Sequence, residues 1–97
     1  MTRNYKKYAD RRFTRMFLLE YLTKNDDAAL TRAMFVMEKN MRDSREIVRS
    51  MEEEGLITVQ WSNSEWQRAR IRITSKGLGV YQILKEMYVM LLPKINI

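Results

Sequence analysis

The spacing of apolar residues changes at Gly55, and this change limits the possible folds more than any other feature of the sequence. Before Gly55 the apolar residues recur at helical spacing, as they do over Leu30–Met37. After Gly55 they alternate with polar residues, as they do over Ile57–Trp61 and again over Ala69–Ile73. Helical spacing is typical of an amphipathic helix, and alternation is typical of a strand with one buried face. The sequence therefore predicts a helical first half followed by a β-hairpin.

The local signals at the ends of these segments give the full element order. Asp10 can cap a first helix, Asn40 can end the second in the left-handed conformation, and Gly55 can end the third. Thr74 or Ser75 can cap a last helix, and Pro93 is consistent with its end. We predict helices over residues 11–24, 28–38, 41–54 and 76–92, and strands over 57–61 and 69–73.

The predicted fold is mostly α with a small β-hairpin, in the order helix-helix-helix-strand-strand-helix. The length of 97 residues suits one domain, which we place at residues 10–92. Residues 1–9 form a basic arm and residues 93–97 a tail in this interpretation.

The chain is basic, and its positive charge is concentrated in three segments. The formal net charge is +6, from 18 basic and 12 acidic residues. Residues 1–15 carry a net charge of +5, residues 42–49 of +1 and residues 65–76 of +3, so the remainder is acidic. Such a balance indicates a polyanionic partner.

The composition argues against catalysis. The chain has no cysteine and no histidine, which removes a thiolate nucleophile, the commonest general base and the commonest metal ligand. Each of the three glycines lies at an expected helix end or start, so a phosphate-binding glycine loop is missing. We expect no enzyme activity, no cofactor and no metal. No apolar run approaches the ~20 residues that span a bilayer, so we expect a cytoplasmic protein without a membrane partner.

Two phrases of the sequence resemble those of winged helix-turn-helix regulators of the MarR, PadR and ArsR-like group, which includes small plasmid- and virus-encoded members. Residues Met51–Ile57 (MEEEGLI) stand where that group ends its recognition helix, within the stretch Met41–Ile57. Residues Ile73–Gly77 (ITSKG), at the end of Ala69–Gly77, stand where its second wing strand meets the last helix. The resemblance covers roughly residues 10–92. It implies a winged helix-turn-helix fold and duplex DNA as the partner.

The third helix is the candidate recognition helix. In this fold it packs one stripe on the core and presents the other to the major groove, where arginine pairs with guanine. The acidic run Glu52–Glu54 would be repelled there, so we expect the N-terminal half to enter the groove. The candidate DNA contacts on this helix are Arg42, Ser44, Arg45, Glu46 and Arg49. The alternative is an ordinary solvated helix face.

The hairpin and the arm supply further candidate DNA contacts, to phosphates or a minor groove. Those of the wing are Asn63, Arg68, Arg70 and Arg72, and those of the arm are Arg3, Lys6, Lys7 and Arg11. The strand arginines could instead form an exposed face or pair with glutamates of a partner subunit. The arm could be a solubilising tail. Trp61 and Trp66 are expected to stack within the hairpin or a dimer.

The first and last helices are apolar on more than one face, which predicts a two-fold homodimer built from them. The expected interface residues are Phe17, Leu78, Tyr81, Leu84, Met87, Tyr88 and Leu91.

The leading functional hypothesis is a homodimeric transcription regulator that binds duplex DNA and acts by occupying an operator. The alternative is a site-binding or DNA-coating protein of a plasmid or genome partition system, with a partner protein of that complex. A third possibility is a winged-helix module whose basic face binds a protein or RNA.

Overall fold

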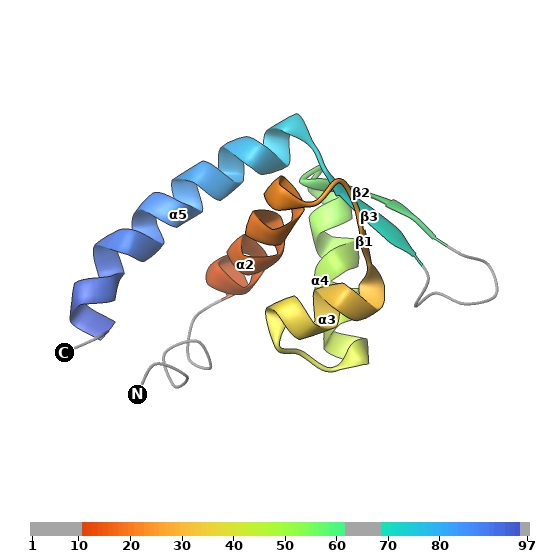
Figure 1. The fold of residues 1–97 in the computed structure, drawn as a ribbon, viewed down its shortest axis with the longest axis horizontal. Coiled ribbons are helices and arrows are strands. Elements are labelled where there is room, and N and C mark those ends of the chain that lie inside the picture. Colours follow the sequence, from red (N-terminus) through yellow and green to blue (C-terminus); the bar gives the residue numbers. More distant parts are fainter. Residues whose placement is uncertain (1–10, 62–68, 96–97) are drawn as a thin grey trace.

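The computed structural model describes residues 11–61 and 69–95 and contains four helices around a small sheet (Figure 1). The predicted order of three helices, a hairpin and a last helix is confirmed. In chain order the elements are α2 (Arg11–Lys24), β1 (Ala28–Ala29), α3 (Leu30–Met37), α4 (Met41–Glu53), β2 (Ile57–Gln60), β3 (Arg70–Ile73) and α5 (Ser75–Ile95).

The sheet has three antiparallel strands in the order β1-β3-β2, one strand more than the sequence predicted. The hairpin pairs Ile57 with Ile73 and Val59 with Ile71. The extra strand is β1, in which Ala28 pairs with Ile71. The predicted second helix was therefore wrong at its start. Alanine favours helices, but here a pairing with a strand some forty residues away determines the conformation.

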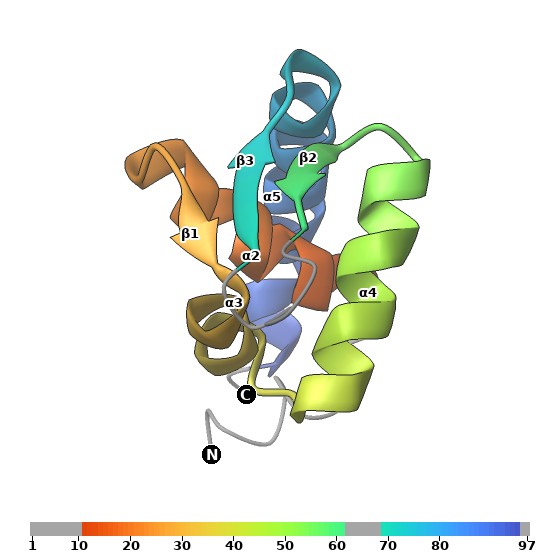
Figure 2. The same ribbon diagram turned by 90° about the vertical axis from the view of Figure 1, so that its right-hand side faces the viewer.

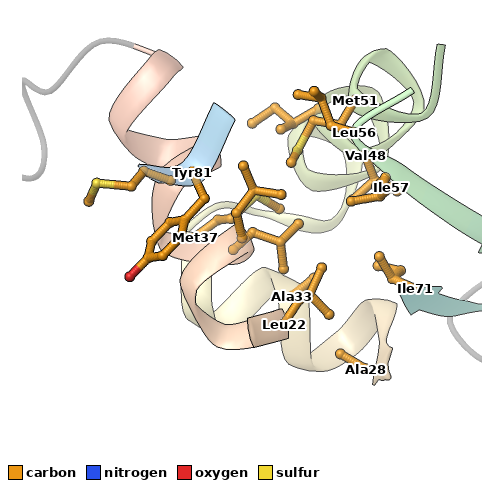
Figure 3. Close-up of a cluster of buried hydrophobic side chains, with 14 of the residues drawn as sticks. Leu22, Ala28, Ala33, Met37, Val48, Met51, Leu56, Ile57, Ile71 and Tyr81 are labelled. Carbon is orange, nitrogen blue, oxygen red and sulfur yellow. The ribbon is translucent and has the colours of Figure 1, made fainter. Parts of the chain in front are cut away.

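The core lies between the helices and one face of the sheet. Leu18 and Leu19 of α2 are fully buried, as are Val48 and Met51 of α4 and Ile71 of β3. Figure 3 shows side chains from α4, β2 and β3 converging with Ala33 and Met37 of α3 and Tyr81 of α5. Because α4 packs against both α3 and the β2 edge of the sheet (Figure 2), its position depends on this shared core.

Helix α5 packs along α2 through aromatic contacts. The rings of Phe13 and Phe17 each meet Tyr88 edge-on, with 5.5 Å between centroids. Tyr81 is buried, and its hydroxyl donates a hydrogen bond to Glu20 Oε2 at 3.3 Å. Leu84 is buried as well.

These contacts correct part of the predicted dimer interface. Tyr81 and Leu84 lie in the core of the single chain, because α5 turns this stripe toward α2. Half-buried residues also pack against that core, namely Phe17, Met87 and Tyr88. Among the described side chains of α5, up to residue 91, the large apolar ones that remain exposed are Leu78, Ile83, Val89, Met90 and Leu91.

The helix ends differ from the prediction at two points. The left-handed residue after α3 is Glu38, with φ of 55°, whereas Asn40 begins the next helix as its N-cap. Helix α5 continues through Pro93 to Ile95 rather than ending at about residue 92 as predicted.

Gly55 ends α4 as predicted and has φ of 78°, a conformation that glycine adopts without steric cost. Its N–H donates to the carbonyl of Glu52, and the N–H of Leu56 donates to the carbonyl of Met51, both at 3.0 Å. These two hydrogen bonds form a Schellman motif, which satisfies carbonyls at the helix end.

Hydrogen bonds connect the end of α4 to the start of α5. We call this junction the α4–α5 joint; it is formed by Glu54–Leu56 and Thr74–Gly77. Thr74 Oγ1 donates to the Gly55 carbonyl at 2.6 Å and accepts from the Gly77 N–H at 3.0 Å. Lys76 Nζ donates to the Glu54 carbonyl at 2.8 Å. Of the two predicted caps, Thr74 and Ser75, it is therefore Thr74 that caps α5, and the same hydroxyl also holds the turn that ends α4.

Gly77 is required by the close packing of this joint, and its substitution gives a test. A Cβ at Gly77 would lie 2.0 Å from the carbonyl oxygen of Leu56, whereas one at Gly79 would meet no atom within 4 Å. We expect Gly77→Ala to lower the free energy of unfolding by about 2 kcal/mol or more, in the range of overpacked sites. Gly79→Ala should be neutral or stabilising by up to about 1 kcal/mol, because alanine favours a helix. Urea unfolding measures both, and equal stabilities would contradict the described joint.

Candidate nucleic-acid interface

Helix α4 begins at a side-chain cap. Asn40 Oδ1 accepts a hydrogen bond from the Asp43 N–H at 2.8 Å, which satisfies one of the free N–H groups of the first turn. The helix then buries a stripe against the core that contains Ile47, Val48 and Met51. The buried stripe fixes which residues of α4 face outward.

The outward stripe of α4 contains most of the residues predicted for its DNA contacts. Arg42, Glu46 and Arg49 are exposed, and Arg45 is half-buried. Their positions differ by three, four and seven residues, so they share one side of the helix. Together with Met41 they line a shallow hollow on the surface. The structure thus brings four of the five predicted α4 residues together.

Ser44 is the exception and corrects the prediction. It is fully buried, and its hydroxyl donates to the carbonyl of Lys39 at 3.4 Å. Its place in the buried stripe keeps its side chain away from the outward stripe, so it is not available for DNA contact.

The acidic end of α4 contacts other elements of the same chain. Arg15 of α2 forms an ion pair with Glu54, with Nη1 and Oε2 2.8 Å apart, and donates to Ser50 Oγ at 2.6 Å. The Ser50 hydroxyl in turn donates to Glu54 Oε2 at 3.2 Å. The carboxylate of Glu54 therefore holds α4 against α2. The spacing of residues within one segment could not reveal this role, because it depends on a contact between two helices.

Trp61 connects the hairpin to the outward stripe of α4. Its Nε1–H donates to Glu52 Oε1 at 3.1 Å, and the guanidinium of Arg49 lies over its ring, 5.1 Å from the centroid. A cation over an indole face is attracted by the ring quadrupole. Trp61 therefore stacks on an arginine of α4, in addition to its place at the end of the hairpin strand β2.

The strand arginines form a second, separate group. Arg70 and Arg72 are exposed on β3, and both meet the carboxylate of Asp27, which precedes β1. Arg70 lines a hollow with Asp27, Arg32 and Phe35, distinct from the hollow along α4. In Figure 2, β1 forms one edge of the sheet, and α4 lies beyond the opposite edge, which is formed by β2. The two groups are therefore not adjacent, and Asp27 was not identified from the sequence.

Several predicted contacts lie outside the described residues. These are Asn63 and Arg68 of the wing and Arg3, Lys6 and Lys7 of the arm. Arg11 is the first residue of α2. Within the part of the chain that the structure describes, no helix is long and apolar enough to cross a membrane.

No family model matches the sequence, and no curated protein matches it. Solved structures do match it. The MarR family transcriptional regulator SPO1453 from Silicibacter pomeroyi is 22% identical, with a TM-score of 0.65 over 84% of this chain and 57% of that one. The transcriptional regulator BldR from Sulfolobus solfataricus is 14% identical, with a TM-score of 0.72 over 86% of this chain and 59% of that one.

A smaller protein is similar over nearly its whole length. Sso10a-2, described as a DNA-binding protein from Sulfolobus solfataricus, is 14% identical, with a TM-score of 0.73 over 91% of this chain and 86% of that one. By contrast, the chain spans between 49% and 62% of the lengths of three further regulators or related chains. At these identities the likeness shows the fold, and it confirms the resemblance drawn from the sequence at that level: the chain has the winged helix-turn-helix fold of MarR-like regulators.

Proposed function

We propose that this protein binds duplex DNA sequence-specifically as a homodimer and regulates transcription by occupying an operator. The observation that carries the proposal is the outward stripe of α4, where three arginines and one glutamate line a single surface. Arginine can donate two hydrogen bonds to guanine in the major groove, which a helix of this size enters. The structural neighbours described as regulators and DNA-binding proteins support the same function.

The distribution of charge along α4 also supports it. The first turn contains both Arg42 and Asp43, and residues 42–49 carry a net charge of +1, while the last turn contains acidic residues and no basic one. A helix on its own favours acidic residues at its N-terminus and basic residues at its C-terminus, because of its partial charges there. The small excess of positive charge in the N-terminal half and the acidic C-terminal end therefore suit an approach of the N-terminal half to phosphates.

Arg15 offsets the unfavourable interaction between acidic side chains and the partial negative charge at the C-terminal end of α4. Its guanidinium neutralises Glu54 and fixes it to α2, and its side chain is only 19% exposed. Glu52 accepts a hydrogen bond from Trp61. The acidic end is thus engaged by the protomer, and the N-terminal half of α4 is the part left for a groove.

The proposed dimer uses the exposed side of α5. Ile83 is 61% exposed and Met90 is 75% exposed, and their separation of seven residues puts both on one side of the helix. That spacing matches the contact seam of a helix pair. In a two-fold dimer of this fold, the two recognition helices lie about 34 Å apart and meet successive major grooves on one side of the duplex.

Arg45→Ala tests whether the outward stripe of α4 contacts the bases of DNA. On a duplex selected in vitro with the wild-type protein, we expect a loss of about 1–3 kcal/mol in binding and a weaker preference at one base position. Lys24→Ala, at the exposed end of α2, removes the same charge away from α4 and serves as the control. Fluorescence anisotropy measures the affinities. An Arg45→Ala protein that binds as the wild type does would show that this stripe does not read DNA.

Replacing both Ile83 and Met90 by Glu tests the proposed dimer. The added charges would be desolvated in a helix-helix contact, so we expect a monomer at micromolar concentration where the wild type is a dimer. Thr31→Glu, exposed on α3, is the control for added charge. Sedimentation velocity distinguishes the states. A monomeric wild type, or a double variant that stays dimeric, would contradict this interface.

A further inference from the structure

We propose that Asp27 limits sequence-independent DNA binding by competing with phosphates for Arg70 and Arg72. The inference rests on the proposed DNA-binding function and adds a residue that sets the strength of binding to the DNA backbone. Asp27 accepts a hydrogen bond from Arg70 through Oδ1, and its Oδ2 lies 4.0 Å from Arg72 Nη2. One carboxylate therefore faces both strand arginines.

The strand register explains why this carboxylate meets both side chains. Ala28 pairs with Ile71, and Ala29 pairs with Arg70. Extending the same antiparallel register by one residue places Asp27 opposite Arg72. Directly opposed residues share a face of the sheet, and diagonal neighbours two residues away are within reach of long side chains. Asp27 is thus the direct neighbour of Arg72 and the diagonal neighbour of Arg70. Ala29, directly opposite Arg70, has a small side chain and leaves room for Arg70 to reach Asp27.

On the β2 side of β3, the residues that pair with Arg70 and Arg72 are not acidic. Arg72 pairs with Thr58 and Arg70 with Gln60, and both of these are exposed and uncharged. The described acid that meets these arginines therefore lies on the β1 side, away from α4. Asp27 draws the two guanidinium groups toward that side.

The exposure of the three side chains makes the contact reversible. Asp27 is 27% exposed, Arg70 is 51% exposed and Arg72 is 68% exposed. Ion pairs at such exposure are weak and screened by salt. A phosphate could replace Asp27, but binding must then first break the existing contact. The cost falls equally on every DNA sequence, because phosphates carry no sequence information.

The consequence concerns the strength of binding to any duplex. The competition lowers the affinity that comes from the DNA backbone, whereas binding of the α4 stripe to bases is unaffected. The ratio of specific to random-sequence affinity should therefore change little, while the absolute affinity for random DNA stays low. Freeing both arginines should raise binding to every duplex.

The test compares Asp27→Asn with Asp26→Asn on a random-sequence duplex of 20 base pairs at several salt concentrations. Asp26 is the exposed neighbouring residue, so both variants lose one negative charge at nearly the same place. We expect Asp27→Asn to bind about two- to fivefold more tightly than Asp26→Asn, in line with the strength of exposed ion pairs. The slope of log affinity against log salt should be equal or steeper by about 0.9 for each additional phosphate that an arginine neutralises.

The role of the arginines is tested by repeating both substitutions in a protein with Arg70→Gln and Arg72→Gln. In that background the two variants should bind equally, because no guanidinium remains to be freed. Asp27→Ser is the second variant should Asp27→Asn fail to fold, which circular dichroism shows. Equal binding of Asp27→Asn and Asp26→Asn in the otherwise wild-type protein would overturn the inference. Absence of DNA binding by the wild type would instead overturn the proposed function on which it rests.

Discussion

The α4–α5 joint is the interaction on which the rest of the structure depends. Thr74 bonds to the turn at Gly55 and caps α5 with the same hydroxyl, and the Thr74 N–H donates to the Leu56 carbonyl at 3.1 Å. The absence of a side chain at Gly77 lets the start of α5 approach that carbonyl. The end of α4, the start of the hairpin and the start of α5 therefore form one rigid corner, and the direction of α4 relative to α5 is fixed there.

The positions of the charged side chains of α4 follow from the way this joint directs the helix. The C-terminal end of α4 lies against α2, where Arg15 engages Glu54, and beside the hairpin, where Trp61 engages Glu52. The N-terminal half of α4 presents Arg42, Arg45 and Arg49 on its outward stripe. The guanidinium of Arg49 lies over the ring of Trp61, so this arginine also contacts the hairpin. The arginines of α4 face outward, and acidic residues at its C-terminal end are held by Arg15 and Trp61. Such a helix is suited to approach a polyanion in one orientation.

Much of the fold could be predicted because its signals are local. The end of α2 follows from the polar residues after Lys24, the start of α4 from the interruption at Asn40, and the turn at Gly55 from one residue that tolerates positive φ. What the sequence could not reveal depends on contacts between distant segments. Strand β1 exists because Ala28 meets Ile71, and Asp27 reaches the strand arginines only through that pairing. Similarly, the apolar spacing of α5 could not show which side faces α2, so Tyr81 was assigned to a partner although it belongs to the core.

The proposed function requires that the N-terminal half of α4 approaches DNA. A titration of 15N-labelled protein with a duplex selected in vitro, followed by amide chemical-shift changes, measures this directly. We expect the largest changes on Met41–Arg49, with smaller ones on Arg70–Ile73 and little change over the middle of α2. Changes concentrated on α3 or on the exposed side of α5, with Met41–Arg49 unaffected, would contradict it.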